Sequence, residues 1–214
     1  MSFVPDLPAL LAFTLAAVIL TITPGPDMTL FLGRTLAQGR AAGLAAMFGA
    51  TSGVVVHTTL AAFGLSALIA ASPEAFLALK VAGAGYLVFL AVQALRSGSA
   101  LNLDEAARPR RQVSLVRNWA TGVGINLLNP KIVLFFVTFL PQFVSVSDPN
   151  ATGKLFFLGI YFIVIATPIA IAMILAADRF ARFLKAKPRV MRAIDYVFAS
   201  VFSAFALQIL LARA

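Results

Sequence analysis

The sequence contains no cysteine, one histidine and one tryptophan among its 214 residues. Disulfides, thiolate chemistry and cysteine-based zinc sites are therefore excluded, and a single histidine cannot form a histidine-rich metal site. Charged residues are also scarce, at 12% of the chain, against about 25% in ordinary globular proteins. We expect no bound metal and no cofactor.

Hydrophobic residues make up 61% of the chain, against about 45–50% in soluble proteins. This surplus of apolar surface needs lipid, and a membrane span needs about 20 mostly apolar residues. Six stretches qualify, at about residues 7–32, 41–70, 75–95, 119–140, 155–177 and 193–211. The sequence therefore predicts an all-α polytopic membrane protein with six transmembrane helices, forming a single domain over residues 1–214.

The net charge of +9 comes from 17 basic residues against eight acidic ones. The basic residues gather in the first, third and fifth linkers and not along one amphipathic face, which disfavours nucleic acid as a partner. By the positive-inside rule these linkers face the cytoplasm and both termini lie outside it. Binding of anionic lipid is the alternative explanation for the basic fifth linker.

Two segments repeat at an offset of 104 residues (130 − 26), namely "PDMTLFL" from Pro26 and "PKIVLFF" from Pro130. In this alignment Asp27 falls on Lys131. Because each half holds three spans, the two halves must be inverted in the membrane, a plan that recurs in secondary transporters. The predicted layout is a first repeat, a cytoplasmic linker and a second repeat, at about residues 1–96, 97–117 and 118–214.

The first helix of each repeat is predicted to break at its proline motif, "TPGPD" with Pro24, Gly25 and Pro26, and "NLLNPK" with Pro130. Proline cannot bond the carbonyl four residues earlier, and glycine permits unwinding. The carbonyls that lose their N–H partner are those of Leu20, Ile22 and Asn126. Unbonded carbonyls cost several kcal/mol each in hydrocarbon, so a polar cavity is predicted at the breaks.

Asp27 and Lys131 are the charges that follow these breaks. Asn129 is predicted to cap the second half-helix, which places Lys131 in a first turn where the helix dipole favours an anion. Either the two charges pair directly, or a zwitterion bridges them with its ammonium toward Asp27 and its carboxylate toward Lys131. We predict that Asp27 is the proton-coupled group and that Lys131 binds the anionic end of a substrate, with Asn126 and Asn129 beside them. A purely structural capping role for Asp27 remains an alternative.

Three further residues are candidates for the cavity wall. His57 either relays protons or is a neutral histidine bonded to a helix carbonyl or a neighbouring threonine. Tyr86 follows the small residues "AGAG", and its hydroxyl either reaches the cavity or packs between helices. Thr23 belongs to the first break itself.

Together with "TPGPD" and "NLLNPK", the segment "KVAGAGYLVFLAVQALR" at residues 80–96 carries a family likeness. The sequence resembles the LysE/RhtB family of bacterial amino-acid exporters over its whole length. The resemblance implies a proton-driven secondary exporter of small amino acids or derivatives, homoserine- or threonine-like or otherwise neutral, in the bacterial inner membrane. The implied partners are an amino acid, protons and the lipid bilayer, and a homodimer is left open.

Other functional classes lack their signatures in this sequence. A channel would show a filter sequence or rings of pore-lining residues. A membrane-embedded enzyme would need a serine–histidine pair, two membrane carboxylates or a metal motif, whereas the spans hold one histidine and one deep acid. We therefore predict that the protein is not an enzyme. A structural or channel-like membrane protein is the alternative, and a membrane-embedded enzyme is a more distant one.

Overall fold

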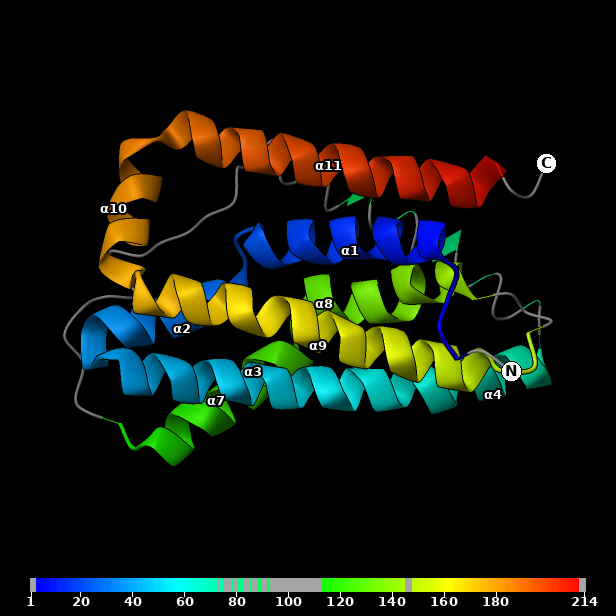
Figure 1. Ribbon diagram of the computed structural model, residues 1–214, viewed down its shortest axis with the longest axis horizontal. Coiled ribbons are helices and arrows are strands. Elements are labelled where there is room, and N and C mark those ends of the chain that lie inside the picture. The colour runs from blue at the N-terminus through cyan, green and yellow to red at the C-terminus, as the bar shows by residue number, and fades with distance from the viewer. Residues whose placement is uncertain are drawn as a thin grey trace.

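Long helices lie side by side along the longest dimension of the molecule (Figure 1). The computed structural model describes residues 3–72, 113–144 and 148–211, with residues 74, 78, 81, 82, 85, 88, 89 and 92. No strand occurs among these residues, so the all-α prediction is confirmed for this part of the chain. The elements are α1 (Leu7–Ile22), α2 (Pro26–Gln38), α3 (Arg40–Leu60), the π-helix η1 (Ala61–Leu65), α4 (Ser66–Ala71), α7 (Leu115–Leu127), α8 (Pro130–Leu134), the π-helix η2 (Phe135–Phe139), the 3-10 helix η3 (Leu140–Phe143), α9 (Ala151–Leu175), α10 (Ala177–Ala186) and α11 (Pro188–Leu211).

Within the described residues, up to four membrane spans are present by length and composition. Two are continuous, one formed by α3 with η1 and the other by α9. The other two are bent pairs, with α2 turning 49° from α1 and the segment Pro130–Phe143 turning 52° from α7. Most of the third predicted span lies outside the described residues, and the sixth falls within α11.

The helix breaks occur at the predicted prolines. Pro26 and Pro130 each take the first position of the second half-helix. Proline suits that position because its missing N–H is not needed there and its backbone angle matches the helix. The prediction that both helices break at their proline motifs is therefore confirmed.

The buried core differs on the two sides of the breaks. Toward the start of α1, the rings of Phe13, Phe135, Phe136 and Phe139 are fully buried, and neighbouring centroids lie 5.0–5.7 Å apart. Toward α10 the core is made of smaller or more flexible residues, among them Met28, Met47, Met173 and Ala177. Methionine adapts its shape more easily than phenylalanine, so the second region is the more deformable one.

Helices α3 and α7 pack in direct backbone contact because small residues face each other. A Cβ on Gly49 would collide with the carbonyl of Trp119, and one on Gly122 with the carbonyl of Ala46. Such small-residue contacts are typical of membrane helix pairs. The close approach brings the end of α7, where the second break begins, against the middle of α3.

The helices that border the basic linkers meet at one end of the bundle. Helix α10 lies across that end, where α2 also ends and α3 and α7 begin, while α1 begins and α11 ends at the opposite end (Figure 1). Arg40 at the start of α3 donates to the carbonyl of Leu175 at 2.9 Å and so caps the last turn of α9. The elements that carry the described basic residues of the linkers, namely the end of α2, the starts of α3 and α7, and α10, thus lie on a common side.

Candidate functional site

The first break exposes carbonyls that a distant lysine satisfies. Helix α1 ends at Ile22, and Pro24 cannot donate to the carbonyl of Leu20. The Nζ atom of Lys131 donates to that carbonyl at 3.1 Å and to the carbonyl of Thr23 at 2.8 Å. The last carbonyls of a helix form the negative end of its dipole, so a cation is favoured there. Lys131 thus finds its negative partner at the end of α1.

The second break is stabilised by hydrogen bonds from its own residues and by one from α3. The Asn129 side chain accepts from the N–H of Lys131 at 3.1 Å, which confirms the predicted N-cap. Pro130 leaves the carbonyl of Asn126 without its usual partner, and the Nε2 atom of His57 lies 3.3 Å from that oxygen. The N–H of Asn129 also donates to it at 3.0 Å. The Asn126 carbonyl, which Pro130 was predicted to release, therefore bonds to His57 of α3 and to the N–H of Asn129.

Asp27 reaches across from the first break to the second. Its Oδ2 atom accepts from the Nδ2 atoms of Asn126, at 2.8 Å, and Asn129, at 3.0 Å. Its Oδ1 atom is buried and accepts no hydrogen bond within the described part of the chain. Asp27 also lies in the first turn of α2, where the helix dipole favours a negative charge. One carboxylate oxygen thus holds the second break and the other is available for a ligand.

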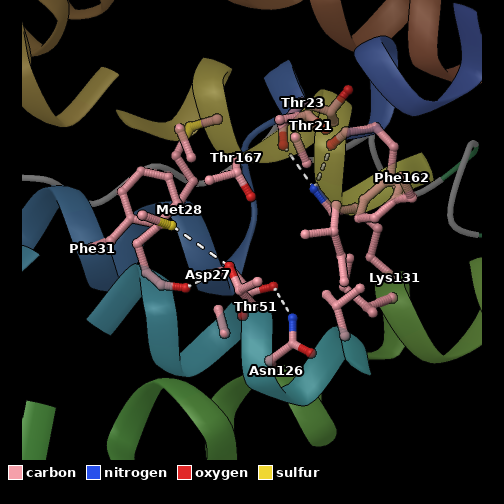
Figure 2. A pocket seen from close by; sticks show the side chains of 18 residues that line it. Thr21, Thr23, Asp27, Met28, Phe31, Thr51, Asn126, Lys131, Phe162 and Thr167 are labelled. Carbon is pink, nitrogen blue, oxygen red and sulfur yellow. Dashed lines mark hydrogen bonds between the residues drawn. The ribbon is translucent and has the colours of Figure 1, made fainter. Parts of the chain in front are cut away.

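Asp27 and Lys131 do not pair with each other. The described residues contain an ion pair between Lys154 and Asp148 but none between Asp27 and Lys131. Figure 2 shows the separation, with Asn126 facing Asp27 on one side of the pocket and Lys131 extending toward Thr23 on the other. Each charge binds the break of the opposite half, so the two breaks are braced against one another. The alternative of a direct ion pair is not what the structure shows.

Gly25 lets Lys131 pass close to the first break. Its backbone is extended, with φ −173° and ψ −176°, which any residue can adopt. A Cβ on Gly25 would lie 3.1 Å from Nζ and 3.3 Å from Cε of Lys131, closer than ordinary van der Waals contact. The expectation that glycine supplies unusual backbone angles is therefore replaced by a requirement for space.

Both breaks face one cavity of about 90 Å³. Its polar lining comes from both breaks and from α1, α3 and α9, and consists of Thr21, Thr23, Asp27, Thr51, Asn126, Lys131 and Thr167. The rest of the wall is apolar, chiefly Met28, Phe31, Met47, Val54 and Phe162. Among the described residues, no three His, Cys, Asp or Glu side chains gather as a metal site would require. The cavity therefore combines one negative and one positive group with a mostly apolar surface.

The other predicted residues have different positions. Thr23 lines the cavity, and its hydroxyl donates to the carbonyl of Ile19 at 2.6 Å. His57 is bonded to a helix carbonyl, one of its two predicted roles, and does not belong to the cavity lining among the described residues. Tyr86 lies outside the described residues.

One part of the cavity wall was not anticipated from the sequence. Helix α9 contributes Thr167, which precedes Pro168 in the middle of that helix. A threonine–proline pair inside an apolar span was the available signal, because proline interrupts the ladder there as it does at the two breaks. Thr51 on α3 also lines the cavity while donating to the carbonyl of Met47 at 3.1 Å.

Comparisons with known proteins point to a single family. A family model described as LysE type translocator matches residues 18–213. The homoserine/homoserine lactone efflux protein of Salmonella typhimurium is 29% identical over 191 residues, covering 89% of this chain and 90% of that protein. The leucine efflux protein of Klebsiella pneumoniae is 29% identical over 202 residues, 92% of each chain. An uncharacterized membrane protein of Vibrio cholerae is 31% identical over 199 residues, 92% of this chain and 94% of that one. No solved structure matches the chain.

Proposed function

The chain belongs to the LysE type translocator family, and on that premise we propose that it is a secondary active exporter of small neutral amino acids or their derivatives, driven by the proton gradient. It is a multi-pass membrane protein of bacteria, and the proposed location is the inner membrane. Two relatives are named for the efflux of homoserine or its lactone and of leucine. These names agree with a small, uncharged side chain on the exported molecule.

The observation that carries the proposal is the presence of Asp27 and Lys131, unpaired with each other, on the wall of one cavity. An amino acid is a zwitterion whose ammonium and carboxylate need partners of opposite charge once they leave water. Asp27 has a buried oxygen without a hydrogen bond among the described residues. A lysine ammonium has three donors, and the carbonyls of Leu20 and Thr23 use two of them. A substrate ammonium at Asp27 would donate to this free oxygen, and a substrate carboxylate at Lys131 would accept the third N–H of the lysine.

The rest of the cavity favours a neutral side chain. Among the described residues of its wall, only Asp27 and Lys131 are charged. A second charge on the substrate would therefore be buried without a partner, which is costly. The cavity of about 90 Å³ is several times the roughly 10–15 Å³ that a single water requires, so it has room for a small molecule. Both considerations support small neutral substrates.

Proton coupling is proposed to act through Asp27. When ionised, its Oδ2 atom accepts two amide N–H bonds from the second break, and bonds to a charged acceptor are the stronger kind. A proton on this carboxyl removes the charge, weakens the brace and removes the partner of a substrate ammonium. Proton and substrate thus compete for one group, and such negative coupling between two ligands is what antiport requires.

The proposed architecture is a pair of inverted repeats with both termini outside the cytoplasm. Support comes from Pro26 and Pro130, which open equivalent half-helices after bends of 49° and 52°. Support also comes from α10, the end of α2 and the starts of α3 and α7, which carry the described basic residues of the linkers and lie at the same end of the bundle (Figure 1). A periplasm-selective reporter fused after Arg213 should be active, and one inserted between Arg96 and Arg108 should be silent. Activity of the inserted reporter would reverse the orientation.

Transport into liposomes containing the purified protein tests the function. Homoserine, threonine and leucine should show saturable uptake when a proton gradient is imposed, and lysine and glutamate should show little. A protonophore should abolish accumulation, and liposomes without protein provide the background. Flux that does not saturate and continues without the gradient would indicate a channel and contradict the proposal.

A further inference from the structure

Among the described residues near the breaks, His57 is the ionisable side chain to which the proposed transport mechanism gives no role. It is buried, with 7% of its surface exposed, and its ring stacks on Phe136 at a centroid distance of 5.8 Å and an angle of 27°. Its Nε2 atom lies 3.3 Å from the carbonyl oxygen of Asn126. A carbonyl only accepts hydrogen bonds, so Nε2 carries the hydrogen in this contact. The ring is thus held in one orientation by packing and by a bond to the backbone.

His57 contacts the carbonyl of Asn126, whose usual helical donor is missing because Pro130 has no N–H. This carbonyl also accepts from the N–H of Asn129 at 3.0 Å, and because its residue is almost fully buried, His57 supplies from another helix the donor for its second lone pair. A proton relay has to offer a nitrogen to a group that gives or takes protons. His57 instead offers Nε2 to a carbonyl, which does neither under physiological conditions, and its Nδ1 atom has no hydrogen-bond partner among the described residues. Its position therefore fits a support for the second break.

Gly53 lies one turn before His57 on the same face of α3 and completes the support. A Cβ on Gly53 would lie 2.9 Å from Cβ and 3.0 Å from Cγ of Asn126, distances that side-chain atoms do not tolerate. The absence of a side chain thus makes room for the Asn126 amide. Its Nδ2 atom donates to Asp27 at 2.8 Å, whereas its Oδ1 atom is buried and accepts nothing among the described residues. The orientation of the Asn126 amide is therefore set by its hydrogen bond to Asp27 and by its contact with Gly53 of α3.

We propose that His57 and Gly53 are positioning residues that seat Asn126, and through it Asp27, for proton-coupled transport, and that His57 does not carry the proton. This inference rests on the proposed function, since it assigns the two residues to the same site. In the described part of the chain, the charged groups near Asn126 are Asp27, which Asn126 contacts directly, and Lys131 on the far side of the break. His57 acts on the carboxylate only through Asn126.

The test compares variants that keep or remove the hydrogen bond. His57→Gln retains an N–H at similar reach but cannot ionise near neutral pH, whereas His57→Leu has no donor. We expect His57→Gln to keep gradient-driven uptake within about threefold of wild type, with an unchanged pH profile. His57→Leu and Gly53→Ala should each shift the midpoint of the pH profile upward by about one unit, because the carboxylate loses a well-placed donor and protonates more readily. Their combined shift should be smaller than the sum, since both act through Asn126.

Two matched controls separate this effect from general damage. Thr59→Ala changes an exposed residue of α3 that bonds its own helix, and Gly124→Ala adds a Cβ where nothing lies within 4 Å. Both should resemble wild type. If His57→Gln loses gradient-driven uptake while it still exchanges labelled for unlabelled substrate, His57 is a relay and the inference is wrong.

A second measurement does not depend on transport. The thermal unfolding midpoint in detergent should fall for His57→Leu and stay near the wild-type value for His57→Gln, because only the leucine removes the donor on α3 and leaves the Asn126 carbonyl with the Asn129 N–H alone. Equal midpoints for both variants would overturn the positioning role. Failure of the wild-type protein to transport any amino acid would instead refute the proposed function. The unfolding midpoints of the His57 variants would then still test whether His57 positions Asn126.

Discussion

The two helix breaks share a proline at the start of the second half-helix but are stabilised in different ways. The first break spans three non-helical residues, 23–25, and its N-cap, Gly25, makes no side-chain capping bond. The second is shorter, and the side chain of Asn129 caps its half-helix. At the first break the carbonyl of Leu20 accepts from Lys131. At the second, the carbonyl of Asn126 is bonded from another helix by His57 of α3.

This difference makes the first break dependent on the second. Lys131 belongs to the second half of the chain, so the first break keeps its carbonyls bonded only while the two halves stay together. The second break has its own cap and the support of His57, and Asp27 adds a bond without being its only partner. A movement that separates the halves should therefore disturb the first break more than the second.

Replacing Lys131 should have the largest effect. Lys131→Met keeps much of the side-chain volume but leaves the carbonyls of Leu20 and Thr23 without their donor. We expect uptake in liposomes to be lost and the free energy of unfolding to fall by about 3 kcal/mol, from two buried acceptors left unbonded. Lys154→Met, which removes a lysine outside the breaks, is the matched control and should remain active. Wild-type stability of the Lys131 variant would mean that the first break does not depend on this residue.

Replacing Asp27 should abolish coupling while sparing the fold. Asp27→Asn has a similar shape but cannot ionise, and the Asn129 cap on the N–H of Lys131 does not involve the substituted side chain. Gradient-driven uptake should fall to background. Exchange of labelled for unlabelled substrate should persist, with apparent affinity weakened by about tenfold through the loss of one charged contact. Accumulation that still follows the proton gradient in this variant would assign coupling to another group.

Gly25 tests whether the first break needs space next to Lys131. In Gly25→Ala the lysine has to shift by a few tenths of an ångström, whereas in Gly25→Leu the larger side chain displaces it. We expect nearly normal uptake for the alanine variant and a loss of about tenfold to a hundredfold for the leucine variant, because small displacements of binding groups cost that much. Gly124→Leu is the control, because nothing lies within 4 Å of a Cβ at that position. Normal transport by Gly25→Leu would refute the requirement for space.

The smallest effect is expected at the loop before α9, whose described residues do not line the cavity. The hydrogen bond from Lys154, together with one from the N–H of Asn150, holds the pKa of Asp148 below its ordinary value of 3.8. A lowered pKa stabilises the folded protein above that value, and the contribution disappears as the pH falls below about 4. Asp148→Asn should therefore leave uptake at neutral pH within about twofold of wild type, as for a surface ion pair. A larger loss would implicate this loop in transport.

Local sequence rules were sufficient for the breaks and for the carbonyls that they release. Proline has no N–H and favours the first helical position wherever it occurs, so Pro24, Pro26 and Pro130 had predictable consequences. The cap by Asn129 followed for the same reason, because capping joins residues two or three positions apart. The location of the polar cavity at the breaks followed from the cost of unbonded carbonyls in hydrocarbon.

The bonding partners could not be read in the same way. The bond from Lys131 to the carbonyl of Leu20 joins residues 111 positions apart, and that from Asn126 to Asp27 joins residues 99 apart. Such contacts depend on how whole helices pack, including the close approach of α3 and α7 at glycines that no capping rule singles out. The role of Thr167 on α9 depends on the same packing.

By itself the sequence determined the helical, membrane-embedded character of the chain, the two proline breaks and the presence of two opposite charges beside them, because these properties arise from composition and from neighbours along the chain. Only the tertiary structure decided that Asp27 and Lys131 bind opposite breaks and not each other. It also decided that His57 bonds the carbonyl of Asn126. Each freed carbonyl takes whichever donor the packed helices bring within reach, and that depends on distances in space and not along the chain.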